Sequence, residues 1–153
     1  MKPIAADKIN SQQGKPFPDP FRHKLEKCHW RRLSAPFNLS ALAANMETIE
    51  PGGQSSLRHW HSHSDEFIYI ISGELILVTD EGRFTMTQGM CMGFAAGDNN
   101  AHHMLNDSEQ SAVYLAVGSC HPNDQVEYPD DDICWRQQDG QWQAFNKQGK
   151  PYK

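Results

Sequence analysis

Three histidines and one glutamate stand close together near the middle of the chain. The stretch LRHWHSHSDEF holds His59, His61, His63 and Glu66 and leads directly into an apolar run. Imidazole nitrogens together with a carboxylate oxygen are the ligand set that suits zinc or a first-row transition metal. The cluster therefore indicates a metal site. The alternative interpretation is a polar surface strand and turn whose histidines hold no metal.

The spacing separates these histidines into two kinds. Alternate side chains of a β-strand share a face, so His59 and His61 can converge while Trp60 turns away. His63 would share that face only if the strand continued, but the residues from Ser62 to Asp65 are typical of a turn. We expect His63 to lie at the rim of the site or to be exposed. A ligand role for it stays open.

A second histidine group follows about 40 residues later, at His102 and His103. In an antiparallel barrel its strand can lie beside the one that carries His59 and His61, and it can then supply a third imidazole. Adjacent residues of a strand point to opposite faces, so only one of the two should face inward.

The elements that must position these side chains are short strands. Runs rich in branched and aromatic residues recur between turn signals, at 67–71, 74–79, 83–87, 91–94 and 111–117, as in an antiparallel all-β sandwich or small barrel. Asp80-Glu81-Gly82 predicts a hairpin. Residues 39–49 indicate a strand, although the alanine-rich stretch 41–44 by itself favours a helix.

These features together resemble the cupin superfamily. The first cupin motif is a glycine, five residues, His-x-His, three or four residues, a glutamate, six residues and a glycine. The chain fits it at every spacing with Gly53, His59, His61, Glu66 and Gly73. The second motif is a glycine, five residues, Pro-x-Gly, two residues, a histidine, three residues and an asparagine. Gly89, Gly97, His102 and Asn106 match it, with Ala95 in place of the usual proline and four residues instead of two before His102.

The resemblance implies a small single-domain cupin: a double-stranded β-helix, or jelly-roll barrel, with one divalent metal at its centre. It assigns His59, His61, Glu66 and His102 as metal ligands and gives Asn106 a motif role. His103 would replace His102 if the strand register slipped by one residue. Iron, manganese, nickel and zinc are all compatible with this ligand set. Asn106 is also compatible with a plain turn residue.

The function implied is that of a metal-dependent enzyme, a dioxygenase (oxidoreductase) or an isomerase, acting on a small polar metabolite. Two alternatives stay open: a non-catalytic binding or sensing module that uses the same pocket, and a barrel whose histidines are vestigial. No catalytic or substrate-binding residue is predicted besides the ligands, although Arg58 and Arg83 are candidate anion contacts. The pocket wall is expected to be apolar, from the strands of Ile68, Ile70, Leu77, Met86, Met92, Phe94 and Leu115.

Length and composition set the frame. The 153 residues suit one domain, which we divide into an N-terminal arm (1–35), the barrel (36–120) and a C-terminal extension (121–153). The net charge of −5 argues against a nucleic-acid partner. No stretch has the apolar character of a signal peptide or a membrane span, so we expect neither. We expect a cytoplasmic protein whose four scattered cysteines are reduced thiols.

The C-terminal extension is rich in large aromatic residues and does not resemble a disordered tail. Asp139-Gly140 stands between Trp135 and Trp142 and predicts a small hairpin. We expect this segment to pack on the barrel or across a subunit interface, and the protein to form a homodimer through edge strands and terminal arms.

Overall fold

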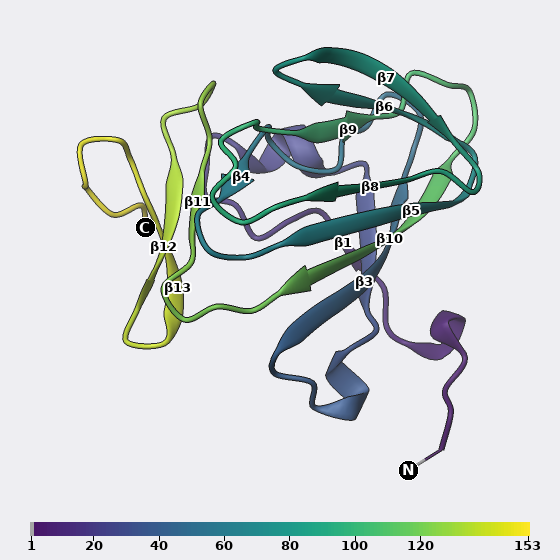
Figure 1. The fold of residues 1–153 in the computed structure, drawn as a ribbon, viewed down its shortest axis with the longest axis horizontal. Helices are drawn as coiled ribbons and strands as arrows, with labels where there is room; N and C mark the ends of the chain where they lie inside the picture. The colour runs from purple at the N-terminus through teal and green to yellow at the C-terminus, as the bar shows by residue number, and fades with distance from the viewer. Residues whose placement is uncertain (1) are drawn as a thin grey trace.

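The computed structural model describes residues 2–153 and consists of antiparallel sheets (Figure 1). The largest sheet has six strands in the order β1-β2-β3-β10-β5-β8. These strands are β1 (Gln12–Gln13), β2 (Cys28–Arg32), β3 (Leu42–Ile49), β10 (Ala112–Ser119), β5 (Glu66–Ser72) and β8 (Cys91–Phe94).

Two smaller sheets complete the fold. One has the order β7-β6-β9 and lies above the large sheet in Figure 1, and the other has the order β13-β12-β11-β4 and lies at its left end. Their strands are β7 (Gly82–Thr87), β6 (Glu74–Thr79), β9 (His103–Leu105), β13 (Gln141–Phe145), β12 (Cys134–Gln138), β11 (Gln125–Glu127) and β4 (Trp60–His61). Three short 3-10 helices lie in the N-terminal part: η1 (Ala6–Lys8) precedes β1, η2 (Arg22–Leu25) lies between β1 and β2, and η3 (Ala35–Phe37) lies between β2 and β3.

The main core lies between the six-stranded and three-stranded sheets. Alternate residues of the strands point into it, as the alternating burial of β6 shows. Its buried members are Ile49, Ile68, Ile70, Leu75, Leu77, Met86, Met104, Ala112 and Tyr114. The predicted all-β jelly-roll architecture is confirmed.

The local predictions agree with most strands. Residues 74–79 and 91–94 are the strands β6 and β8, and the loop at Asp80-Glu81 joins β6 to β7 as a hairpin. The alanine-rich stretch 41–44 is strand rather than helix from Leu42 onward, because β3 pairs with β2 on one side and β10 on the other. Tertiary pairing here outweighs the helix propensity of alanine.

The two ends of the chain meet in a second core. The N-terminal residues Phe17, Phe21 and Leu25 pack with residues of the C-terminal sheet, namely Val126, Tyr128, Ile133 and Ala144. The hairpin predicted at Asp139-Gly140 is present, with φ of 51° and 77° at these residues. The division into arm, barrel and extension stays a prediction, but β2, from the predicted arm, extends the large sheet through β3.

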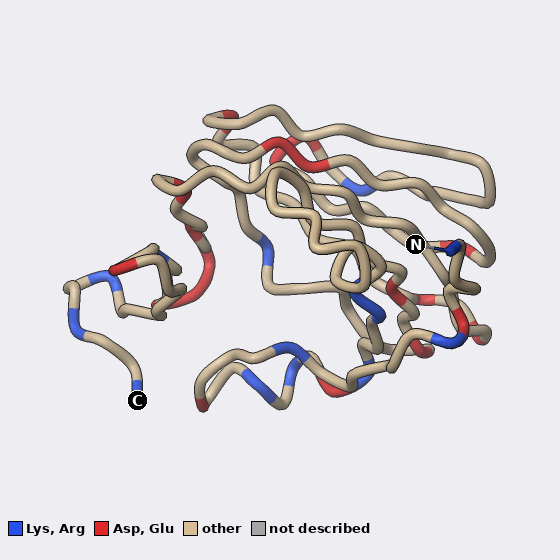
Figure 2. Tube along the Cα trace, turned by 90° about the horizontal axis from the view of Figure 1, so that it is seen from below, with Lys and Arg blue, Asp and Glu red and all other residues tan. Residues whose placement is uncertain are grey.

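The charged residues are dispersed. Within the described residues, Lys and Arg are interspersed with Asp and Glu along the trace (Figure 2). No helix of residues 2–153 is long and apolar enough to cross a membrane. All four cysteines are free thiols.

Candidate metal centre

Three of the predicted side chains converge on a carboxylate oxygen of the fourth. The Oε2 atom of Glu66 lies 3.3 Å from His59 Nε2, 3.5 Å from His61 Nε2 and 2.9 Å from His102 Nε2. His59, His61 and Glu66 form a group whose ligand atoms all lie within 4.8 Å of one another, close enough to hold a metal ion. His102 reaches the same oxygen from a segment that is distant in the sequence.

Strand pairing brings these residues together. His59 and His102 exchange both backbone hydrogen bonds, at 3.0 and 2.9 Å, and this pairing settles the register that the sequence left open. Glu66 begins β5 opposite Phe94, and His61 ends β4 opposite Val126 of β11. The site therefore depends on two different sheets and on the isolated bridge between His59 and His102.

Hydrogen bonds on the far side of the rings orient two of the imidazoles. His59 Nδ1 donates to the Leu57 carbonyl at 2.9 Å, and His61 Nδ1 lies 2.6 Å from Asp124 Oδ2. A proton held on Nδ1 leaves the Nε2 lone pair free and aimed at Glu66. This is the tautomer that a metal-binding histidine requires.

Two atoms of the centre have no hydrogen-bond partner within residues 2–153. Glu66 Oε2 and His102 Nδ1 are both buried without a hydrogen bond, and for Glu66 Oε2 this holds although three Nε2 atoms lie within 3.5 Å of it. An unpaired buried carboxylate oxygen is costly, and it is explained where a cation lies among the same donor atoms. Three imidazole nitrogens around this oxygen fit a divalent metal of the zinc or first-row transition type.

The electrostatics are those of a tightly coupled group. Burial opposes the ionisation of Glu66, but the three surrounding imidazoles outweigh it and hold its pKa well below the ordinary value. Burial lowers the pKa of His102. Burial acts in the same direction on His61, but its bond to Asp124 and the charge of Glu66 raise its pKa overall. A proton on His61 would therefore compete with a metal at this site.

Two adjoining cavities border Glu66. One, of about 450 Å³, is lined by His61, Asp124 and Arg32, among others. The other, of about 220 Å³, is lined by His59 and His102 and by the polar side chains of Lys15, Asn45 and Glu47. On another side, Phe94 stacks on His102 with ring centroids 3.5 Å apart. The centre is covered on that side and accessible from the cavities.

The remaining predicted histidines lie outside this group. His63 is exposed and stacks on His121 with ring centroids 5.0 Å apart. His103 faces away and its Nδ1 bonds to the Ser56 carbonyl at 3.0 Å. Asn106 is fully buried and holds its turn, donating to the carbonyls of Ile49 and Gln110 at 2.8 Å each.

The predicted apolar pocket wall needs correction. Leu115 faces the outer side of the sheet, because its neighbour Tyr114 is the buried, inward residue of β10. Met92 pairs with the inward Ile68 but is 36% exposed. The two candidate anion contacts are bound elsewhere, Arg58 to Asp80 and Asp130 and Arg83 to Asp107.

The wall is instead partly polar, through residues that the sequence analysis missed. Asp124 had no motif to mark it, since it contacts His61 only through the pairing of β4 with β11. Asn45 and Glu47 could have been found from the sequence, because polar residues two apart in a predicted strand share a face. The missed residues that line the cavities are Lys15, Asn45, Glu47 and Asp124.

The family model described as Cupin domain matches residues 45–118. No curated protein matched the chain in sequence. Among solved structures, a sugar phosphate isomerase from a cupin superfamily, from Silicibacter pomeroyi, is 32% identical, covers 99% of this chain and 97% of its own, and has a TM-score of 0.93.

Two further structures are similar over a smaller share of the chain. A putative sugar phosphate isomerase from Acidithiobacillus ferrooxidans is 25% identical, with 78% of this chain and 76% of its own covered and a TM-score of 0.71. The polyketide cyclase RemF from Streptomyces resistomycificus is 19% identical, with 79% and 80% covered and a TM-score of 0.66, and shows the shared fold alone.

Proposed function

Since the chain belongs to the cupin superfamily, we propose that it is a metal-dependent isomerase that acts on a small phosphorylated sugar. The observation that carries this proposal is the similarity to the Silicibacter pomeroyi sugar phosphate isomerase at 32% identity over 97% of that chain. The convergence of three imidazoles on Glu66 beside a cavity supports it. An isomerase is one of the two enzyme classes that the sequence motifs predict.

We propose His59, His61, Glu66 and His102 as the metal ligands. The unpaired Oε2 atom of Glu66 and the Nδ1 bonds of His59 and His61 support this set. A bound divalent iron, manganese, nickel or zinc ion would act as a Lewis acid toward a substrate carbonyl or hydroxyl. The protein's own part is to keep the Nε2 atoms deprotonated and oriented.

The wider cavity offers a contact for the phosphate group. Arg32 is exposed, lines this cavity, and makes no side-chain hydrogen bond or ion pair within the described residues. It pairs in register with Asn45, so both lie on the inner side of the sheet. A free guanidinium lining a cavity that borders the proposed metal site suits a phosphate monoester.

The test is proton exchange at a sugar carbon. Protein prepared without a histidine tag is loaded with each metal and incubated in D₂O with aldose and ketose phosphates, and NMR follows the interconversion and the deuterium that enters next to the carbonyl. We expect both in the wild type and neither in His59→Ala or Glu66→Gln. Metal-loaded wild type without exchange on any sugar phosphate would overturn the isomerase proposal.

The alternatives have distinct readouts. Oxygen consumption by the iron-loaded protein with thiols, catechols or keto acids would favour a dioxygenase. Absence of turnover, combined with ligand-dependent thermal stabilisation, would favour a binding module. A protein that takes up no metal in calorimetry would have vestigial histidines.

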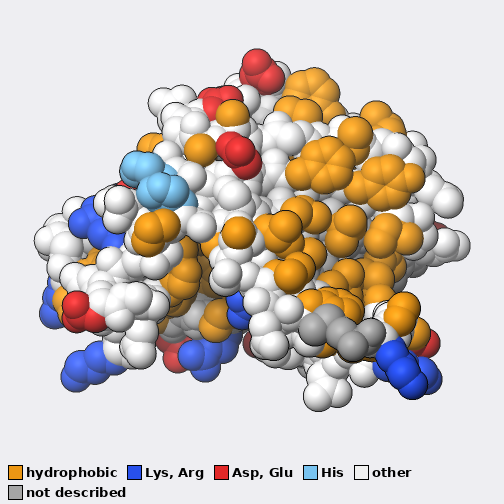
Figure 3. Space-filling view, turned by 60° about the horizontal axis from the view of Figure 1, so that its bottom comes forward, with side chains coloured by type: hydrophobic (Ala, Val, Ile, Leu, Met, Phe, Trp, Pro, Cys, Tyr) orange, Lys and Arg blue, Asp and Glu red, His pale blue; other side chains and the backbone are white. Residues whose placement is uncertain are grey.

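We also propose a homodimer whose interface is the outer face of the six-stranded sheet. Exposed large apolar residues of β5, namely Phe67, Tyr69 and Ile71, gather there. Glu66, the charged residue of this strand, faces the opposite side, toward His59 and His61. Figure 3 shows hydrophobic side chains collected over one broad face of the molecule. A second copy presenting the same apolar patch is the partner that fits it around a two-fold axis.

A further inference from the structure

A lysine from the N-terminal segment reaches into the cavity of the metal centre. Lys15 lines the cavity of about 220 Å³ together with His59, Glu66 and His102. Its Nζ lies 2.8 Å from Glu47 Oε2, and its side chain is only 17% exposed. Glu47 also accepts the Tyr114 hydroxyl at 2.5 Å. A buried ammonium is therefore fixed beside the proposed metal site, although it lies far from the cupin motifs in the sequence.

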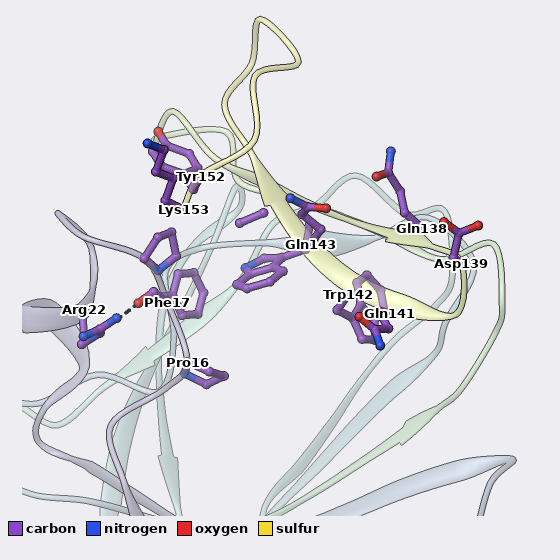
Figure 4. A pocket seen from close by; sticks show the side chains of 13 residues that line it. Pro16, Phe17, Arg22, Gln138, Asp139, Gln141, Trp142, Gln143, Tyr152 and Lys153 are labelled. Carbon is purple, nitrogen blue, oxygen red and sulfur yellow. Dashed lines mark hydrogen bonds between the residues drawn. The ribbon is translucent and has the colours of Figure 1, made fainter.

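The chain holds Lys15 from both sides. Before it, Gln12 and Gln13 pair with β2, and the Trp30 indole donates to the Gly14 carbonyl at 2.8 Å. After it, Phe17 is buried edge-on against Tyr128 and Trp135. Figure 4 shows Phe17 beside the C-terminal hairpin with Arg22 bonded to its carbonyl, at 3.1 Å. The position of Lys15 is thus built into the fold.

Some hydrogen-bond donors and acceptors of this cavity have no partner within residues 2–153. An ammonium has three donors, and within residues 2–153 that of Lys15 makes one polar contact, to Glu47. Asn45, which follows the same inward face of β3 as Glu47, has a buried Oδ1 without any partner. The cavity therefore presents free donors and a free acceptor to whatever occupies it.

We propose that Lys15 and Asn45 form a substrate-binding subsite that recognises a polyhydroxylated compound, Lys15 donating to one substrate oxygen and Asn45 accepting from a neighbouring hydroxyl. This inference rests on the proposed function. It assigns the hydroxyl-bearing part of the substrate to the cavity that Lys15 and Asn45 line. Glu47 and Tyr114 position the ammonium. A purely structural ion pair would account for Glu47, but it would leave the unpaired Asn45 oxygen unexplained.

The experiment compares two probes on the cobalt-loaded protein, followed by the visible spectrum of the metal. D-Erythronohydroxamate carries chain hydroxyls next to its chelating group, and acetohydroxamate carries none. We expect the wild type to prefer the first probe at least tenfold. Lys15→Met and Asn45→Leu should each lower the ratio of the two affinities about tenfold. This is the effect expected when a hydrogen bond to a charged group is lost or when a buried hydroxyl loses its hydrogen-bond partner.

Controls separate binding from folding. Lys8→Met, which removes an exposed lysine of the same N-terminal segment, should leave the preference unchanged, and Lys15→Arg should retain part of it. Lys15→Met/Glu47→Gln avoids an unpaired buried carboxylate and should lose the preference like Lys15→Met. The melting temperature of Asn45→Leu should be no lower than that of the wild type, because the side-chain Oδ1 of Asn45 has no hydrogen-bond partner to lose.

The outcomes are distinguishable. Unchanged preference in Lys15→Met and Asn45→Leu, or a wild type without preference, would overturn the subsite. A wild type that shows the preference but exchanges no proton on any sugar phosphate would overturn the isomerase proposal while supporting the subsite. A wild type that takes up no cobalt would overturn both.

Discussion

At the scale of single residues, the contact between His61 and Asp124 connects the candidate metal centre to the rest of the protein. Asp124 is buried, and besides His61 it accepts the backbone N–H of His63 at 2.9 Å. The carboxylate therefore orients the ring and holds the turn that follows it. Partners of this kind raise the basicity of a metal-binding imidazole.

Removing this carboxylate should weaken metal binding. We expect Asp124→Asn to bind zinc about 10- to 100-fold more weakly than the wild type at about pH 8, because the His61 ring loses its charged partner. Competition with a chromophoric chelator measures the affinity. Asp107→Asn removes an exposed carboxylate that pairs with Arg83 and serves as the control. Equal affinities of Asp124→Asn and the wild type would contradict the prediction.

The same pair predicts a pH dependence of stability in the metal-free protein. The pKa of His61 is raised above its ordinary value of 6.5, with the Asp124 bond as the largest cause acting in that direction. The stabilisation is fully present below that ordinary value and is lost as the pH rises through the raised pKa. Asp124 itself titrates below its ordinary value of 3.8, outside this range.

We therefore expect the melting temperature of the metal-free wild type to exceed that of Asp124→Asn most at about pH 6, and the difference to shrink toward about pH 9. Scanning calorimetry of both proteins in chelator measures it. A difference that stays constant over this range would show that His61 does not contribute.

At the scale of elements, the motif glycine that ends β5 has a steric role. Gly73 has a φ of 80°, and a Cβ there would lie 2.8 Å from the Ala112 Cα atom, where β10 begins. Both the left-handed backbone and the close approach require glycine. The last glycine of the first motif is thus required by the tight turn between β5 and β6.

Gly73→Ala should destabilise the protein by about 2–3 kcal/mol, because strain at a positive φ adds to the clash with a neighbouring strand. Gly93→Ala in β8 is the matched control, since a Cβ there would meet nothing closer than 3.8 Å. It should change stability by less than about 1 kcal/mol. Urea denaturation of both variants compares them. Similar losses would show that backbone entropy, and not close packing, sets the requirement.

At the scale of the whole molecule, the apolar outer face of β5 in the large sheet determines the expected assembly. Tyr69 is 41% exposed at its centre. Tyr69→Glu would place a charge in the proposed interface, and we expect it to convert the dimer to a monomer. Sedimentation velocity at micromolar concentration measures the change.

The control uses an equally exposed aromatic residue on another sheet. Phe84 of β7 is 47% exposed, and Phe84→Glu should leave the dimer intact. A wild type that sediments as a single monomeric species would contradict the proposed interface. A monomer produced by Phe84→Glu would place the interface on the three-stranded sheet instead.

The sequence by itself determined the all-β class, most strands and the His59, His61 and Glu66 cluster. These are local properties: alternation with a period of two, turn residues, and ligand spacing within one strand and its turn. The Asp139-Gly140 hairpin belongs here too, because two residues with positive φ suffice to specify it.

Only the tertiary structure decided which distant residues join the cluster. His102 rather than His103 faces Glu66 because His59 pairs with His102 across the barrel. Asp124 and Lys15 reach the site from the two ends of the chain through sheet pairing and a shared aromatic core. Such contacts depend on strand register and long-range packing, and neither is contained in the local pattern of residue types.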